Sequence, residues 1–439
     1  MKTDLPPSST HAANGGAADA VVVGGGIVGI CTARYLQRSG RTVTVIERGR
    51  PGDGASGHNG GVFNVGECVP TGTPGVLRSV PKMLRDPMSP LVIRYRYLPR
   101  LAPWLTRFVL ASRASRVEQI AVALQSLTAR AMDGYQPLLE GTTAEPLVHT
   151  GGALFAYRHH DVFARDRFAH DLRTRRAVKF DLLDDTAITA LDPALAGRFE
   201  RGVHLPEAHF TNDPERLTRE LAAQFTANGG TLLHASVDRL ERRNGRVHAV
   251  ATTTGSIRTD TVVIAAGAWS RRLVRQLGLD VPLDTERGYG VHLPDPGITV
   301  KLPVIVPDFH VAFRATPTGL QLSGVDELAS VSAPPDYALA DRIIRAAQII
   351  FPELRTDGAT RWMHCRPSLP DSLPIIGAVP RYPNAYLAFG HGHKGLCLGA
   401  ITGKLVQELI DDKPTSVDVE PFSPTRFSLR PRRAGRTQP

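Results

Sequence analysis

Residues Val21–Arg48 read VVVGGGIVGICTARYLQRSGRTVTVIER and contain the strongest local signal of the fold. A short apolar strand leads into the pattern Gly24-x-Gly26-x-x-Gly29, in which the glycines allow a tight turn, close approach of a pyrophosphate and close helix–strand packing. The helix expected over residues 27–39 directs its positive end at phosphates. Glu47 ends the next strand, 18 residues after Gly29 and close to the spacing of about 20 at which an acid binds the adenosine ribose. The stretch therefore predicts a βαβ unit that binds a dinucleotide.

Length and composition set the organisation around this unit. The chain has 439 residues, of which 42% are hydrophobic and 21% charged, so an ordinary globular protein of two domains is expected. No apolar run approaches the length of about 18 residues that a membrane span needs. Residues 1–18 lack the apolar core of a secretion signal and are rich in small and polar residues, which predicts a disordered leader and a cytoplasmic location.

The cysteines and the net charge exclude several classes of protein. Cys31, Cys68, Cys365 and Cys397 form no C-x-x-C pair, so we expect no metal site and no disulfide framework. The net charge of +10 is concentrated in residues 85–116 and in residues 421–439, which are expected to form a disordered basic tail. No zinc-finger or RNA-recognition motif accompanies this charge, and no nucleic-acid partner is expected.

The stretch LVIRYRYLPRLAPWLTRFVLAS, residues 91–112, interleaves arginines with apolar and aromatic residues. One interpretation is a peripheral contact with the inner face of the plasma membrane. The other, which the base rates favour, is a helix of the second domain that packs its apolar side and leaves its arginines in water. The sequence leaves both open.

Three further stretches favour FAD over a nicotinamide cofactor. GASGHNGG, residues 54–61, follows the βαβ unit with small residues that let the backbone pass a large flat cofactor. TVVIAAGAWS, residues 261–270, predicts another strand of the same sheet, with Gly267 permitting close approach. Residues 385–410 predict a strand, a glycine-rich turn and a helix that begins near Gly395. The N-terminus of that helix would stabilise negative charge on a reduced flavin.

With these stretches, ERGYGVHLP (residues 286–294) and RPSLPDSLPIIG (residues 366–377), the chain resembles the D-amino-acid oxidase and glycine oxidase superfamily, and within it bacterial D-amino-acid dehydrogenases. The resemblance covers residues 19–412. It implies an α/β fold class, in which a Rossmann-type FAD-binding domain carries a discontinuous α+β substrate domain with an antiparallel sheet over the flavin. The implied FAD-binding domain comprises residues 19–75, 212–275 and 371–412, and the implied substrate domain comprises residues 76–211 and 276–370.

The resemblance also implies which residues bind FAD. They are Gly24, Gly25, Gly26, Ile27, Val28, Gly29, Glu47, Arg48, Ser56, Asn59, Gly60, Gly61, Val237, Gly267, Gly392, Lys394, Gly395 and Leu396. Sarcosine oxidase relatives attach FAD to a cysteine at the position that His364 holds here. We therefore expect non-covalent FAD.

By the same resemblance, the enzyme performs oxidative deamination of a small amino acid, expected to be a D-amino acid. Hydride would pass from the substrate Cα to flavin N5, and hydrolysis of the imine would give a 2-oxo acid and ammonia. Either quinone or oxygen would then reoxidise the flavin. The alternatives are an enzyme of the same fold acting on D-hydroxyproline, glycine, sarcosine or an opine, and a non-catalytic flavin-binding subunit.

Arg366 is the residue that the resemblance places against the substrate carboxylate, and a guanidinium suits a planar carboxylate through two parallel hydrogen bonds. The alternative is that Arg366 pairs with Asp371 and braces its loop. Tyr289, His310 and Phe313 are further pocket candidates on strands expected over the flavin, of which alternation lets about half face the ligand. Glycine oxidase relatives carry a carboxylate-binding tyrosine where this chain has Ala312 and Phe313, so the second half of that clamp is missing.

Overall fold

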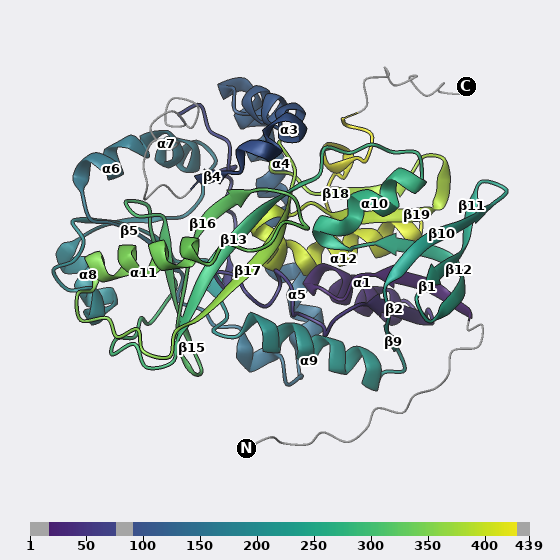
Figure 1. The fold of residues 1–439 in the computed structure, drawn as a ribbon, viewed down its shortest axis with the longest axis horizontal. Helices are drawn as coiled ribbons and strands as arrows, with labels where there is room; N and C mark the ends of the chain where they lie inside the picture. Colours follow the sequence, from purple (N-terminus) through teal and green to yellow (C-terminus); the bar gives the residue numbers. More distant parts are fainter. Residues whose placement is uncertain (1–16, 76–90, 428–439) are drawn as a thin grey trace.

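The computed structural model describes residues 17–75 and 91–427. Within these residues the chain forms two large β-sheets side by side, each covered by helices (Figure 1). One sheet has eight strands and contains the strand that leads into the glycine turn. The other sheet has nine strands. The first contains a parallel core and the second is mostly antiparallel, which confirms the predicted α/β fold class.

The first sheet is built around β1 (Ala17–Val23), which pairs in parallel with β2 (Val43–Glu47) and with β12 (Gly255–Ile264). The apolar run of β1 is buried from both sides, as expected for a central parallel strand. α1 (Ile27–Arg38) begins directly after the glycine turn, and Gly40 ends it with a φ of +88° that a left-handed turn requires. The predicted βαβ unit is therefore present. The other strands of this sheet are β9 (Thr231–His234), β10 (Val237–Arg243), β11 (Arg246–Thr252), β18 (Ile375–Val379) and β19 (Tyr382–Phe389).

Helices cover both faces of the first sheet. α9 (Pro214–Ala227) and α12 (Gly395–Ile410) pack with α1 on one face, and α10 (Ser270–Gln276) lies on the other. α12 approaches α1 so closely that a Cβ at Gly403 would lie 2.7 Å from the backbone carbon of Cys31. All four cysteines are buried and free.

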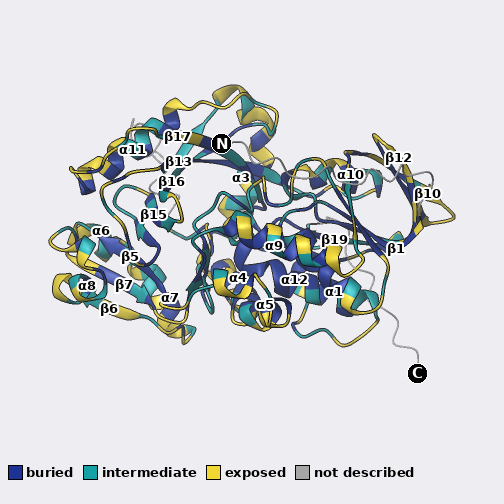
Figure 2. Cartoon of the chain, turned by 90° about the horizontal axis from the view of Figure 1, so that it is seen from below, coloured by how far each residue is buried: buried dark blue, intermediate teal, exposed yellow. Residues whose placement is uncertain are grey.

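Two helices from residues 76–211 pack against the first sheet and the helices that cover it. α4 (Ala114–Thr128) and α5 (Ala131–Leu139) share a core with α12, and buried residues gather where these helices meet (Figure 2). Tyr135 on α5 donates a hydrogen bond to the carbonyl of Leu396 at 2.5 Å. No local sequence pattern predicts this docking, because it depends on tertiary packing. The exact domain boundaries stay a prediction.

The second sheet brings together strands from distant parts of the chain in the order β17-β13-β16-β15-β14-β5-β7-β6, with β4 beside β16. α11 (Ala338–Ile350) packs its apolar side against one face of the β13–β16 region. The strands are β4 (Leu91–Ile93), β5 (Ala153–Tyr157), β6 (Asp181–Asp184), β7 (Arg201–Leu205), β13 (Asp284–Leu293), β14 (Val304–Val306), β15 (Val311–Thr316), β16 (Gly319–Leu328) and β17 (Thr360–Ser368). The short pair β3 (Val62–Phe63) and β8 (His209–Phe210) forms a separate ribbon. Other helices are α3 (Leu98–Ala111), α6 (His160–Arg165), α7 (Arg167–Arg175) and α8 (Asp185–Leu191).

Both terminal predictions need correction at their inner ends. β1 begins at Ala17, inside the predicted leader of residues 1–18, because Ala17 and Ala18 pair with β12. The predicted disordered tail of residues 421–439 is wrong for its first residues, since Phe422 is fully buried and Arg426 forms an ion pair with the buried Asp371 at 2.8 Å. Residues 1–16 and 428–439 lie outside the described residues.

Candidate active site

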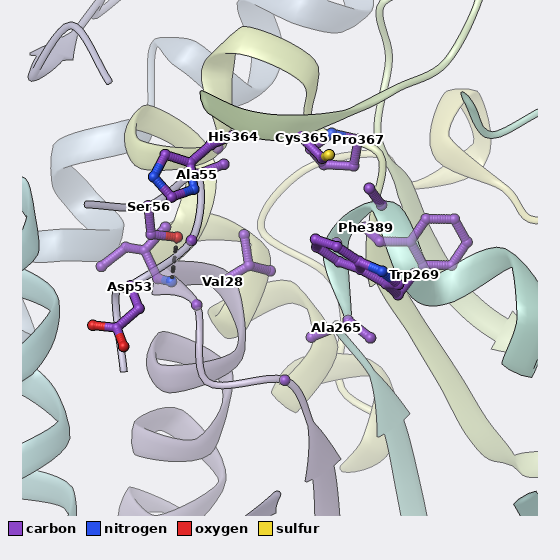
Figure 3. A pocket seen from close by; sticks show the side chains of 18 of the residues that line it. Val28, Asp53, Ala55, Ser56, Ala265, Trp269, His364, Cys365, Pro367 and Phe389 are labelled. Carbon is purple, nitrogen blue, oxygen red and sulfur yellow. Dashed lines mark hydrogen bonds between the residues drawn. The ribbon is translucent and has the colours of Figure 1, made fainter. Parts of the chain in front are cut away.

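A cavity of about 450 Å³ lies where the glycine turn meets β17 of the second sheet. Its lining comes from the turn after β1, the loop after β2, the ends of β12 and β19, and the N-terminus of α12. Figure 3 shows Ser56 and His364 on one side of this pocket and Trp269 and Phe389 on the other. The two sheets therefore contribute different walls to one site.

The glycine turn is held by close backbone contacts. Gly24 has a φ of +114°, and a Cβ there would lie 2.4 Å from the carbonyl oxygen of Ala265. At Gly29 a Cβ would lie 1.9 Å from the carbonyl oxygen of Gly24. Gly26 differs, because a Cβ there would meet only the Ser56 hydroxyl, at 3.0 Å. Gly24 and Gly29 thus maintain the turn, whereas Gly26 keeps the cavity open.

Glu47 holds the glycine turn in place through hydrogen bonds of its carboxylate. Its Oε2 accepts a hydrogen bond from the Gly25 N–H at 2.6 Å, and its Oε1 accepts one from the Gly49 N–H at 3.0 Å. A carboxylate has about four acceptor positions, so Glu47 retains capacity for ribose hydroxyls. Next to it, Arg48 stacks its guanidinium over the Trp269 ring at 3.8 Å from the centroid, which closes this end of the cavity.

The loop after β2 carries the glycine-rich stretch of residues 54–61. Ser56 Oγ accepts a hydrogen bond from the Ile27 N–H at 3.0 Å, capping the start of α1 (Figure 3). Asn59 folds its side chain back onto the loop and accepts from the Gly61 N–H at 2.8 Å. Arg314 from β15 donates to the Asn59 carbonyl at 3.3 Å, and burial lowers its pKa to about 10. Arg314 therefore ties the loop to the second sheet.

The residues present fit FAD. The buried His58 Nδ1 and Trp362 Nε1 line the cavity without a hydrogen-bond partner in the described part of the chain. Two helix N-termini, those of α1 and α12, also meet there, and such termini favour phosphate or flavin anions. A long cavity with free donors at its walls is the form that a dinucleotide needs.

Most of the predicted FAD residues line this cavity. Those that do are Gly24, Gly26, Ile27, Val28, Glu47, Arg48, Ser56, Asn59, Val237, Gly267, Gly392, Gly395 and Leu396. Those outside its lining are Gly25, Gly29, Gly60, Gly61 and Lys394. Gly25 and Gly29 shape the turn itself, and Lys394 donates to the carbonyl of Val69 at 3.5 Å. Their direct contact with FAD stays a prediction.

Strand alternation decides which residues of the second sheet face the cavity. Arg366 and Trp362 of β17 lie across two glycines of β13, so that a Cβ at Gly288 or at Gly290 would collide with them. His364 lies between them on the same face.

The three further pocket candidates do not line the cavity. Tyr289 is fully buried on the other face, where it donates to Glu327 at 2.8 Å and burial raises its pKa to about 12. Phe313 is also buried on that face and packs edge-on against Phe351 at 5.2 Å. His310 lies in the turn before β15 with a φ of +50° and is exposed. The side chains of Tyr289 and Phe313 belong to the interior around the second sheet.

Arg366 does line the cavity. Its partner within the protein is not Asp371, which the alternative had predicted. It forms an ion pair with Asp326 of β16, which Gly288 allows it to reach. Asp371 instead pairs with Arg426. The alternative in which Arg366 braces Asp371 is therefore wrong, because Arg426 already occupies that carboxylate.

A second ion pair lies beside the first. His393, in the turn before α12, places Nε2 2.8 Å from Glu286 Oε2 and 4.0 Å from Asp326 Oδ2. His393 and Arg366 together hold the pKa of Glu286 below its usual value, against burial, which alone would raise it. Four ionisable groups from four segments thus form one cluster. Sequence reasoning missed His393, Glu286 and Asp326, although the first two lie in the motifs that carried the resemblance.

A third group consists of aromatic side chains. His58 stacks on His364 with ring centroids 4.5 Å apart, and Trp362 lies 5.7 Å from His364. Burial, followed by His58 and Arg366, lowers the pKa of His364 to about 4, and burial also lowers that of His58. Both rings are thus held neutral near pH 7. The alternation of Trp362, His364 and Arg366 along one strand was the available sequence signal.

A glycine turn on a parallel sheet, with a second sheet closing a dinucleotide-sized cavity, defines an FAD-binding class of oxidoreductase. The family described as DAO, FAD dependent oxidoreductase, matches residues 19–409, and the chain belongs to it. The protein is an FAD-dependent enzyme, as the sequence predicted. No helix in the described ranges is both long and apolar enough to cross a membrane.

Individual relatives extend this comparison. The chain is 35% identical over 413 residues to the D-amino-acid oxidase of Bradyrhizobium diazoefficiens, covering 92% of this chain and 98% of that protein. It is 32% identical to the D-amino acid dehydrogenase of Paramagnetospirillum magneticum, covering 93% and 98%. Among solved structures, glycine oxidase from Geobacillus kaustophilus superposes with a TM-score of 0.69 at 21% identity, covering 94% of this chain and 99% of that one. L-proline dehydrogenase from P. horikoshii gives 0.69 at 20%, covering 94% and 98%. These two structures show the shared fold.

Proposed function

We propose that this enzyme oxidises a D-amino acid to an imine, which water hydrolyses to a 2-oxo acid and ammonia. Curated relatives across nearly the whole chain carry the names D-amino-acid oxidase and D-amino acid dehydrogenase. The observation that carries the proposal is the position of Arg366, the one side chain of β17 that brings a permanent positive charge to the cavity lining. Such a charge suits the carboxylate that every amino acid has.

Arg366 has the freedom to bind that carboxylate. Its Nη1 donates to Asp326, while Nη2 and Nε have no hydrogen-bond partner within the described residues. A guanidinium can therefore keep Asp326 and still offer two parallel donors to a substrate carboxylate. The side chain is mostly buried, with 18% of its surface exposed, so the bond would form with little competition from water.

The remaining residues of the site orient the reaction. Bound FAD supplies the acceptor for the two electrons that leave the substrate. The N-terminus of α12, at Gly395, would stabilise negative charge near this acceptor. His58 and His364 are held neutral by burial, so they offer hydrogen bonds without adding positive charge beside the substrate.

Anaerobic mixing of the holoenzyme with amino acids tests the proposal directly. We expect D-amino acids to bleach the flavin absorbance and the corresponding L-enantiomers to leave it unchanged. D-Hydroxyproline, glycine, sarcosine and an opine belong in the same panel, because the sequence left them open. Bleaching by L-amino acids alone, or by none of these compounds, would refute the proposed function.

We further propose quinone as the electron acceptor, reached at an anionic membrane surface. The supporting observation is α3 together with the residues before it, where Arg96 and Arg100 are exposed beside Tyr95, Leu98 and Leu110. An arginine near an anionic surface contributes about 1 kcal/mol of attraction. Exposed apolar side chains between such arginines suit the interface of a membrane.

Liposome flotation separates this proposal from the oxygen alternative. The protein is expected to float with anionic vesicles and to remain behind with neutral ones, and the double variant Arg96→Glu, Arg100→Glu is expected to lose flotation. Arg165→Glu, on the exposed α6, is the matched control. Equal flotation with both vesicle types, or rapid release of hydrogen peroxide during turnover, would favour an oxidase without membrane contact.

A further inference from the structure

The cluster around Arg366 contains more negative charge than an amino-acid carboxylate requires. Asp326 and Glu286 lie beside Arg366 and His393, from β16, β13, β17 and the turn before α12. Glu286 is largely buried and Asp326 is one-third exposed. Two carboxylates therefore already lie beside Arg366, which is expected to bind the carboxylate of the substrate as well.

Counting charges shows what the loaded site lacks. With the substrate carboxylate present, three negative groups would face Arg366 and His393, and at most two positive charges could oppose them. The substrate α-amine cannot supply the difference during the reaction, because its nitrogen lone pair must form the C=N bond. An unpaired buried charge is costly. The site is thus at least one positive charge short of neutrality.

Neighbouring cations do not fill this gap. Arg287 points to the other face of β13, where it pairs with Glu327 at 2.9 Å. Arg94 reaches the same Glu327 at 2.5 Å. Lys394 turns its ammonium toward the carbonyl of Val69. The missing charge has to arrive with the substrate.

The sheet also leaves space for a longer side chain. The face of the second sheet that carries Asp326 and Arg366 has small, partly exposed residues at Ala312 of β15 and Ser323 of β16. Gly288 and Gly290 of β13 lie on the same face but are covered by the Arg366 guanidinium and the Trp362 ring. Ala312 lies on this face, while Phe313 points away into the core. A substrate held by Arg366 could extend along this strip past Asp326.

We infer that Asp326 selects amino acids whose side chain ends in a cation, a guanidinium or an ammonium. The substrate carboxylate binds the free donors of Arg366, and the side-chain cation pairs with Asp326 and restores neutrality. This inference rests on the proposed function, since it concerns the substrate of the same site. It makes Asp326 a specificity-determining residue.

D-Arginine and D-citrulline give a matched pair of substrates, because they have nearly the same shape and differ by one charge. The wild-type enzyme is expected to reduce its flavin with a kcat/KM about 10- to 100-fold higher for D-arginine, the range of one charge-assisted hydrogen bond. Asp326→Asn is expected to bring this ratio near one, mainly by loss on D-arginine. Asp341→Asn, in the exposed pair with Arg361, is the control and should keep the wild-type ratio.

A binding measurement separates failure of this inference from failure of the proposed function. 5-Guanidinopentanoate lacks the α-amine and cannot be oxidised, and it differs from 5-ureidopentanoate mainly by its cation. Titration of the holoenzyme, followed by the flavin spectrum, should show tighter binding of 5-guanidinopentanoate, and Asp326→Asn should abolish the difference. If no amino acid bleaches the flavin but this preference holds, the proposed reaction fails and the charge selection stands. Equal use of D-arginine and D-citrulline, or an equal loss on both in Asp326→Asn, would overturn the inference, because Asp326 would then serve a group that both substrates share.

Discussion

The glycine turn and the charged cluster serve the same cavity but are held in different ways. The turn consists of backbone, fixed by contacts within one βαβ unit and by the carboxylate of Glu47. The cluster consists of side chains from four segments that are distant in sequence, each fixed mainly by an opposite charge. A substitution in the turn therefore changes the volume that the cavity offers to the cofactor. A substitution in the cluster changes the charge of the site with little effect on that volume.

The largest expected effect is a steric one in the turn. Gly26→Leu should fold, because Gly26 has a φ of −72° and its added Cβ would meet only the Ser56 hydroxyl. The rest of the leucine side chain would occupy the path of the pyrophosphate. We expect the purified variant to be colourless, with native circular dichroism and no flavin released by acid. Ala223→Leu, exposed on α9 and away from the cavity, is the control, and it should remain yellow. A yellow Gly26→Leu protein would contradict the assignment of this turn.

The next effect is chemical and leaves the cofactor in place. Arg366→Lys replaces a planar fork by a point charge and removes the two parallel donors. We expect kcat/KM for the amino acid to fall about a hundredfold, at 1.4 kcal/mol per decade. Flavin content and the visible spectrum should stay as in the wild type. Arg361→Lys, exposed on the same strand, should change neither quantity. Near wild-type efficiency in Arg366→Lys would mean that the carboxylate is bound elsewhere.

The same difference explains how much of the molecule could be predicted. The turn is local, so its spacing and the position of Glu47 were sufficient to predict the βαβ unit, whereas the other FAD residues followed from the family resemblance. Arg366 followed from one motif, but its partner Asp326 lies 40 residues away on another strand. Pairing across a bulge between Gly288 and Tyr289 decides which side chains meet, and no local pattern contains that register.

The tail illustrates the same limit. A Pro- and Arg-rich segment has the composition of disorder, yet Arg426 satisfies a carboxylate that would otherwise be buried alone. The ion pair between Arg426 and Asp371 depends on the tertiary fold, which composition alone does not predict. Phe422, fully buried nearby in the chain, adds an apolar anchor.

A smaller effect concerns pH and the histidine of the cavity wall. The pKa of His364 is lowered from 6.5 to about 4 in the folded state. The unfolded chain binds its proton first, so this residue's contribution to stability is present above about pH 6.5 and is lost as the pH falls toward 4. We expect the free energy of unfolding, measured with denaturant at constant excess FAD, to fall by about 1.5 kcal/mol less between pH 6.5 and 5 in His364→Asn than in the wild type. The exposed His160→Asn should follow the wild type. An unchanged pH dependence in His364→Asn would show that the ring is accessible to protons.

The smallest expected effect tests the two faces of the second sheet. Tyr289 is next to Gly288 in sequence, but alternation turns it away from the cavity, and its hydroxyl bonds Glu327 and the Asp336 N–H at 2.8 and 3.0 Å. Tyr289→Phe should destabilise the protein by about 1 kcal/mol, because both bonds are lost. Its kcat/KM should stay within about twofold of the wild type, since no contact with substrate is removed. Denaturant unfolding and anaerobic flavin reduction measure the two quantities on one preparation. A large loss of kcat/KM without a loss of stability would place Tyr289 in the substrate pocket, and the side chains of β13 would then have to be reassigned between the two faces.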